Sequence, residues 1–126
     1  MFVPHVIVEF VDAHQACTLQ IHDKIRVQLQ LDPHQTYLLM ACLAIEIPPG
    51  KFRENVLRDA LKANYLTDPR PATLGYVETN NHLSLSQTIP LAILNGERLA
   101  GFFSAFLAEA KSWIQAIEQG KSSPSP

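Results

Sequence analysis

Residues 16–31, Ala-Cys-Thr-Leu-Gln-Ile-His-Asp-Lys-Ile-Arg-Val-Gln-Leu-Gln-Leu, contain the pattern that decides the fold. Apolar and polar residues alternate over residues 16–21 and again over 24–31, and this spacing predicts two β-strands, each with one apolar face. Strands separated by so short a link pair as an antiparallel hairpin. The apolar residues share a face in one register, which leaves residues 22–24 as the loop. In that register the facing pairs are Ile21 with Ile25, Leu19 with Val27 and Cys17 with Leu29.

Residues 32–47 fit two different structures. Asp32 and Pro33 have the form of a helix N-cap followed by a proline at the first helical position. Residues 37–45 are instead continuously apolar, as expected for a central strand that is covered on both faces. Local sequence rules leave both structures open, and the break at Pro48-Pro49-Gly50 ends the segment in either case.

The second half of the chain contains two predicted helices and a second hairpin. Apolar residues at helical spacing predict an amphipathic helix over about residues 51–65 and a longer, more apolar helix between Asn95 and Gly120. The hairpin between them has predicted strands at 73–78 and 82–89, with an asparagine-containing turn at 79–81. Adjacent hairpins and two amphipathic helices predict an α+β fold.

Composition excludes several classes of function. The chain has 126 residues, of which 47% are apolar, and a formal charge of −2. It lacks the basic character of a dedicated nucleic-acid or anionic-membrane binder, and no apolar run reaches the roughly 20 residues of a membrane-spanning helix. Cys17 and Cys42 are too few for a disulfide framework and no secretory signal is recognisable, so we expect a reduced, cytoplasmic protein.

Side chains with metal-binding or catalytic potential form no convincing site. Those closest together in sequence are Asp12, His14, Cys17, His22 and Asp23. Strand alternation turns Cys17 and His22 to opposite faces, and the compact spacing of structural zinc sites is absent. His82, Ser84 and Ser86 share a strand face, but neighbours two residues apart lie about 7 Å from each other, too far for a direct hydrogen bond. We therefore predict no catalytic residue, no metal ligand and no cofactor.

The number of apolar side chains predicts a partner surface. If the last helix covers a small sheet, the apolar residues of the middle helix and the following strand remain exposed to solvent unless something else packs against them. These residues include Leu57, Leu61, Tyr65, Leu66, Leu74 and Tyr76. Packing within the chain, a seam between two copies and a contact with another partner are the three alternatives.

Several short motifs resemble those of one family in order and spacing. Along the chain they are Cys17-Thr18-Leu19-Gln20-Ile21, Leu61-Lys62-Ala63-Asn64-Tyr65-Leu66, Thr73-Leu74-Gly75-Tyr76, Leu83-Ser84-Leu85-Ser86 and Ile89-Pro90-Leu91, followed by a helix with Leu99, Phe102, Phe106, Ala110 and Trp113. This order, over about residues 10–117, resembles the class I type III secretion chaperones related to the Tir chaperone and the SycE chaperone. The resemblance favours a strand over residues 35–46.

The resemblance implies a definite architecture. We expect a single chaperone-like α+β domain over residues 1–120, with an antiparallel five-stranded sheet, helices on one face and the order β-β-β-α-β-β-α. Residues 121–126 are predicted to be a disordered tail. The family begins with an amphipathic helix, whereas residues 1–11 are few and contain Pro4, so we expect that helix either to be short or missing or to lie upstream in a longer natural product.

The resemblance also implies a function. It predicts a cytoplasmic bacterial homodimer that is not an enzyme and that binds the N-terminal, non-globular segment of a secreted effector to keep it export-competent. The dimer interface is then assigned to Leu57, Leu61, Tyr65, Leu74 and Tyr76. Effector contacts are assigned to Leu19, Ile25, Val27, Leu29 and Tyr37. The alternatives are a small metal- or ligand-binding module that uses the His14–His22 region, and a regulatory or structural component of the secretion apparatus with the same fold.

Overall fold

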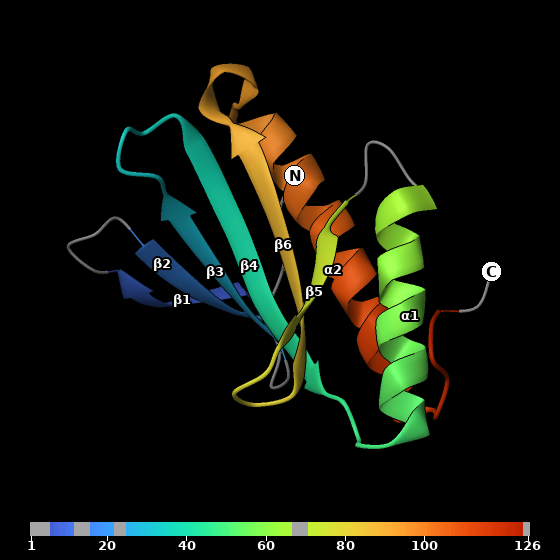
Figure 1. The fold of residues 1–126 in the computed structure, drawn as a ribbon. Helices are drawn as coiled ribbons and strands as arrows, with labels where there is room; N and C mark the ends of the chain where they lie inside the picture. The colour runs from blue at the N-terminus through green and yellow to red at the C-terminus, as the bar shows by residue number, and fades with distance from the viewer. Residues whose placement is uncertain (1–5, 12–15, 22–24, 67–70, 125–126) are drawn as a thin grey trace.

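The computed structural model describes residues 6–11, 16–21, 25–66 and 71–124 (Figure 1). Its strands are β1 (Val6–Val11), β2 (Ala16–Ile21), β3 (Ile25–Leu31), β4 (Tyr37–Glu46), β5 (Thr73–Val77) and β6 (His82–Pro90). Its helices are α1 (Lys51–Leu66), the short 3-10 helix η1 (Leu91–Ile93) and α2 (Gly96–Glu118). None of the helices in these ranges is long and apolar enough to cross a membrane. The predicted α+β class is confirmed.

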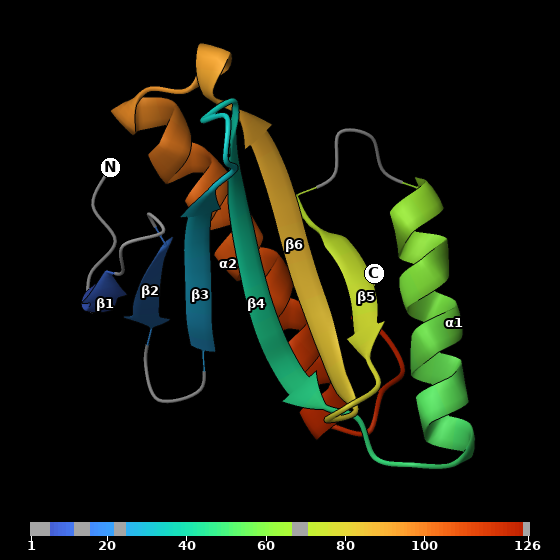
Figure 2. The same cartoon turned by 60° about the vertical axis from the view of Figure 1, so that its left-hand side comes forward.

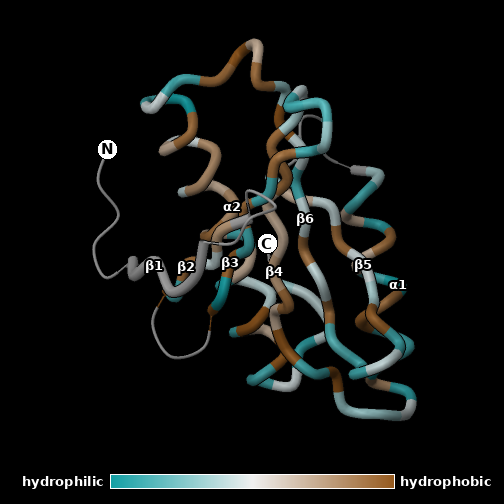
Figure 3. Tube along the Cα trace, turned by 90° about the vertical axis from the view of Figure 1, so that its left-hand side faces the viewer, coloured by the Kyte–Doolittle hydropathy of each residue, from teal (hydrophilic) through white to brown (hydrophobic). Residues whose placement is uncertain are grey.

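All the strands form one antiparallel sheet in the order β1-β2-β3-β4-β6-β5. The predicted register of the first hairpin is confirmed, with Ile21 opposite Ile25, Leu19 opposite Val27 and Cys17 opposite Leu29. Residues 22–24, the predicted loop, lie outside the described residues. Alternation of apolar and polar residues is visible as changes of colour along the strands in Figure 3.

The sheet has one strand more than the five predicted. β1 pairs with β2 at the edge of the sheet, and its register shifts between Val8 and Phe10. This additional edge strand was not expected, because Pro4 interrupts the N-terminal stretch of the sequence, whereas β1 begins only at Val6. Residues 6–11 are mostly β-branched, a composition that favours a strand over the family's leading helix.

Asp32 explains why residues 32–46 form a turn and a strand instead of a helix. Its carboxylate accepts hydrogen bonds from the backbone N–H groups of Thr36 at 2.6 Å and Tyr37 at 2.7 Å. Gln35 has a φ of 54° within this turn. The Asp-Pro pair therefore closes the β3–β4 turn and does not begin a helix. The Tyr37 N–H, foremost among several hydrogen bonds, lowers the pKa of Asp32.

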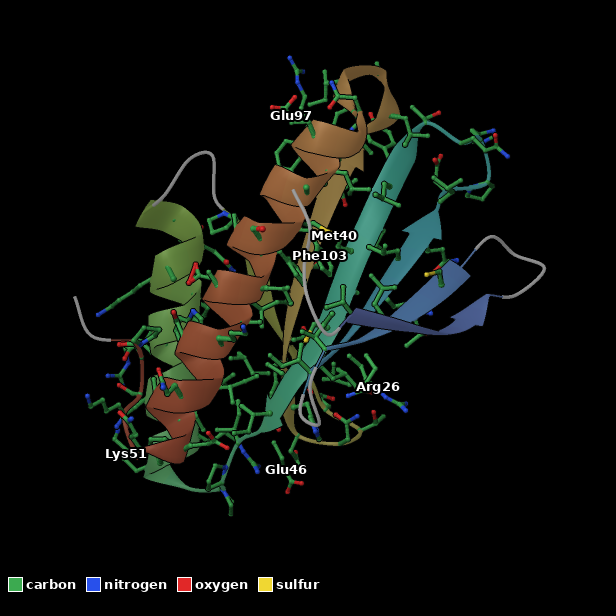
Figure 4. All side chains as sticks on the ribbon, turned by 180° about the vertical axis from the view of Figure 1, so that it is seen from behind. Arg26, Met40, Glu46, Lys51, Glu97 and Phe103 are labelled. Atoms are coloured by element: carbon green, nitrogen blue, oxygen red, sulfur yellow. The ribbon has the colours of Figure 1, made fainter. Side chains whose placement is uncertain are left out.

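The core lies between the sheet and the two helices. Met40 of β4 and Phe103 of α2 meet where α2 crosses the sheet, and Arg26 lies apart from this region (Figure 4). Phe106 is fully buried, and Trp113 is 2% exposed. Full burial of one such side chain stabilises the fold by roughly 1.5–3 kcal/mol. Val56 and Ala60 of α1 belong to the same cluster, so both helices cover one face, as predicted.

The ends of α2 match the sequence prediction. The side chain of Asn95 accepts a hydrogen bond from the Arg98 N–H at 2.8 Å and caps the first turn. Gly120, just after the helix, has a φ of 79°, which a glycine adopts at little cost. Residues 121–124 then turn back to α1, where the Ser122 hydroxyl donates a hydrogen bond to the Asp59 carboxylate. This part of the predicted disordered tail is therefore placed against the domain.

Candidate binding surfaces

Helix α1 is tied to the sheet near both ends. At its first turn, the Arg53 guanidinium donates two hydrogen bonds, of 3.1 and 2.6 Å, to the backbone carbonyl of Ile47. Near its last turn, the Asn64 amide is hydrogen-bonded to both the N–H and the C=O of Leu74, each at 2.9 Å. These contacts fix the rotation of α1, so they determine which of its side chains face outward.

The outward side chains of α1 include an apolar strip, here called the α1 strip and consisting of Leu57, Leu61 and Tyr65. Leu61 is 62% exposed and Tyr65 is 89% exposed, while Leu57 is half-buried against the core. The three residues are four apart, so they line up along one side of the helix. Large apolar side chains exposed in a row indicate a contact with another molecule.

Strand β5, which lies next to the α1 strip, supports the strip from behind and exposes little apolar surface of its own. Leu74 of β5 is 7% exposed and belongs to the core. Tyr76 is half-buried, and its hydroxyl donates a hydrogen bond to the Asn81 side chain at 2.5 Å. Of the residues predicted for the dimer interface, Leu61 and Tyr65 are therefore exposed, Leu57 and Tyr76 are half-buried, and Leu74 lies in the core.

A second apolar surface lies on the face of the sheet that α2 does not cover (Figure 2). Alternate residues of β4 point there, and Tyr37, Leu39 and Leu43 are 45%, 37% and 48% exposed. We call these three residues the open-face patch. Around them the neighbouring strands present polar side chains, namely Thr18, Arg26, Gln28, Ser84 and Ser86. Together with Leu43, these polar residues line a shallow hollow of about 590 Å³.

Most of the side chains predicted to contact an effector lie in the core of the domain. Leu19, Ile25 and Val27 are 9%, 4% and 0% exposed and lie in the core. Leu29 is half-buried and packs against the same cluster. Only Tyr37 lies on the open face. Alternation along a strand separates two faces but does not say which of them a helix covers. The sequence therefore does not distinguish these buried residues from Leu39 and Leu43, which the structure leaves exposed.

A family model agrees with this fold over most of the chain. The model of the Tir chaperone protein (CesT) family matches residues 8–114. The chain belongs to the Tir chaperone (CesT) family. This confirms the family that the sequence motifs predicted. No sequence among the curated proteins matches the chain.

Solved structures show the same fold. A chain of the HopA1–SchA chaperone–effector complex matches with a TM-score of 0.68 and 23% identity, covering 85% of this chain and 80% of that one. A chain of the ExsC–ExsE complex gives 0.67 and 18%, with coverages of 86% and 80%. The complex of the Yersinia pestis type III secretion chaperone SycH with a fragment of YscM2 gives 0.65 and 17%, with coverages of 82% and 83%.

This member of the Tir chaperone family has side chains that could bind a metal or act as nucleophiles. Within the described residues, these side chains do not come together in one site. The described ranges contain no group of three or more His, Cys, Asp or Glu side chains that could hold a metal ion. His14 and His22 lie outside those ranges. Cys17 and Cys42 are free thiols, and burial raises the pKa of Cys42 to about 11, which keeps it protonated and unreactive.

A smaller cavity lies where α1, α2 and the C-terminal segment meet. It has a volume of about 360 Å³ and is lined in part by Lys62, Leu74, Glu109 and Trp113. Burial raises the pKa of Glu109. No sequence motif marks this cavity, because its walls come from segments that are far apart along the chain.

Proposed function

We propose that this chain is a type III secretion chaperone that binds the N-terminal, non-globular segment of a secreted effector and keeps it export-competent. In this proposal it acts in the bacterial cytoplasm as a homodimer, and it catalyses no reaction. The observation that carries the proposal is the family match over residues 8–114, in a chain that exposes two separate apolar surfaces.

The α1 strip is proposed as the seam between two copies. A two-fold axis beside α1 would bring the strip of one copy onto the strip of the other, so that each exposed leucine and tyrosine is covered. Tyrosine is among the residues most often found as energetic centres of protein interfaces. Leu74 lies behind the strip, and its hydrogen bonds with Asn64 hold α1 in position, while the Tyr76 hydroxyl donates to Asn81 in the turn between β5 and β6.

The open-face patch is proposed as the surface for the effector segment. Tyr37, Leu39 and Leu43 form an apolar line along β4, and polar side chains, one of them the charged Arg26, border this line on both sides. Such a surface suits an extended or amphipathic segment that places apolar side chains on the line and its polar groups on the border. Unlike the α1 strip, it lies on the side of the sheet away from α2, so both surfaces can be occupied together.

The proposal is tested by affinity capture from a host that carries its own type III system. The wild-type chain should retain a protein that the system exports, and binding should map to the N-terminal segment of that protein when truncated forms are tested in purified form. Leu43→Glu should abolish retention, because it places a charge on the apolar line. Ile93→Glu is the matched control, since Ile93 is exposed on η1. Failure of the wild-type chain to retain any exported protein would contradict the proposal.

A further inference from the structure

The hollow on the open face is produced by small side chains on neighbouring strands. Ala41 of β4 and Ser84 and Ser86 of β6 line it, and Ala41 is paired with Ser86 directly across the two strands. Gly75 of β5 is paired with Ser84, and a Cβ atom on Gly75 would lie 3.0 Å from the Ser84 Oγ. The longer side chains that line the hollow are Arg26, Gln28, Leu43 and Val77. A space of about 590 Å³ has room for a large side chain of a partner, and side chains that fill such pockets supply much of the binding energy of interfaces.

Arg26 supplies the charge at this hollow. Of the described residues that line it, Arg26 is the one with a charged side chain. Val27, the next residue of β3, is paired with Cys42, so Arg26 lies across from Leu43 on the open face. On its other side Arg26 is paired with Gln20, and its Nε donates a hydrogen bond to the Gln20 Oε1 at 2.8 Å. The guanidinium is therefore held at the rim of the hollow, next to an exposed leucine.

We propose that the open face selects effector segments in which a large apolar side chain is accompanied by an aspartate or glutamate, and that Arg26 binds this acidic residue. The apolar side chain enters the hollow and packs on Leu43, while the carboxylate accepts hydrogen bonds from the Arg26 guanidinium. Neighbouring strands are about 4.8 Å apart, so the acidic residue lies within two positions of the apolar one. This inference rests on the proposed function, and it adds a charge requirement to a surface that was assigned to the effector from its apolar residues.

The chemistry of the guanidinium makes Arg26 a specificity-determining residue. Its planar N–H groups match the two oxygens of a carboxylate, and hydrogen bonds between charged groups are roughly twice as strong as those between neutral groups. An ion pair on an open surface contributes little, because water and salt screen it. A bound segment covers Leu43 and the guanidinium beside it and displaces part of that water, which strengthens the attraction. A segment with a lysine or arginine at the same place is repelled, so Arg26 also excludes wrong partners.

The charge requirement is tested by selecting peptides from a phage-displayed library of random sequences. The wild-type chain should enrich peptides that contain a large apolar residue with Asp or Glu within two positions of it. Arg26→Gln should enrich apolar peptides without the acidic residue, and Arg26→Glu should enrich peptides with Lys or Arg in its place, because the charge at the rim is removed or reversed. Arg58→Gln, which removes the same charge from an exposed position on α1, is the matched control and should select the same peptides as the wild-type chain.

A double-mutant cycle measures the contact itself. One acidic peptide from the wild-type selection, and the same peptide with its acidic residue replaced by the matching amide, are titrated by fluorescence anisotropy. Arg26→Gln should weaken binding of the acidic peptide about 10-fold, the scale of a hydrogen bond to a charged group, and should leave binding of the amide peptide nearly unchanged. Arg26→Lys should retain part of the preference, because it keeps the charge and loses the planar fork. Added salt should weaken binding of the acidic peptide to the wild-type chain more than to Arg26→Gln.

Failure of the charge requirement and failure of the open-face site give different results. The first case is a set of wild-type peptides that Leu43→Glu no longer binds, but in which Asp and Glu are not enriched, or which Arg26→Gln selects equally well. That result overturns the role of Arg26 and leaves the open-face site intact. In the second case the wild-type chain selects no peptide, or the selected peptides still bind Leu43→Glu. The open-face site then fails, and the role of Arg26 fails with it.

Discussion

Replacing Leu61 with alanine should weaken self-association about 150-fold while each copy stays folded. The substitution removes three carbon atoms, which are worth roughly 2.4 kcal/mol on full burial at about 0.8 kcal/mol per methylene. Leu61 is 62% exposed in the single chain, so about 1.5 kcal/mol of this is available on association. A two-fold interface contains the residue twice, and about 3 kcal/mol corresponds to about 150-fold in Kd.

Sedimentation velocity over a range of concentrations measures this change directly. Ile93→Ala serves as the control, because Ile93 is 44% exposed but lies on η1 and outside the α1 strip. The free energy of unfolding of the single chain should fall by only about 0.9 kcal/mol in Leu61→Ala, the share of the side chain that is already buried. An unchanged Kd for Leu61→Ala, equal to that of Ile93→Ala, would refute the reasoning that places the seam on α1.

Three further changes test the fold and its pH dependence. Phe106→Ala should lower the free energy of unfolding by about 3–5 kcal/mol, measured by urea denaturation, because the ring is fully buried. Asp32→Ala should speed hydrogen exchange at the Thr36 and Tyr37 amides at neutral pH. Since hydrogen bonding lowers the pKa of Asp32, wild-type protection there should be lost as the pH falls below the ordinary carboxyl range, and retention of protection in acid would contradict this. Glu109→Gln should raise the melting temperature at neutral pH, because burial raises the pKa of Glu109 and disfavours its charged form. This increase in melting temperature should vanish at pH values below the pKa of the glutamate in the unfolded chain. An increase that persists there would contradict this explanation.

Patterns within single elements predicted the local structure well. Alternation over residues 16–31 determined the register of β2 and β3, because a slip of one residue would have turned every apolar side chain to the wrong face. The apolar stripe of α2 and its Asn95 cap predicted a helix that the structure confirms. The α+β class followed from these elements.

Relations between elements were harder to predict. The helix-covered face of β3 and the open face of β4 look equivalent in sequence until α2 is placed, which is why Val27 was assigned to a partner and Leu43 was not. The hydrogen bonds between Asn64 and Leu74 join residues of α1 and β5, two elements that a loop separates along the chain. Asp32 had two competing roles, as a helix cap and as a turn residue, and the choice depended on the strand that follows it.

The most direct test of the account is to map an effector segment onto the two apolar surfaces. The N-terminal segment of a retained exported protein is added to the ¹⁵N-labelled chain, and the backbone amide shifts are followed by NMR. The account predicts that the shifts change at Tyr37, Leu39 and Leu43 on the open face, with little change along the α1 strip. Changes that are confined to Leu57, Leu61 and Tyr65 would contradict it, because one surface would then have been assigned to the wrong partner.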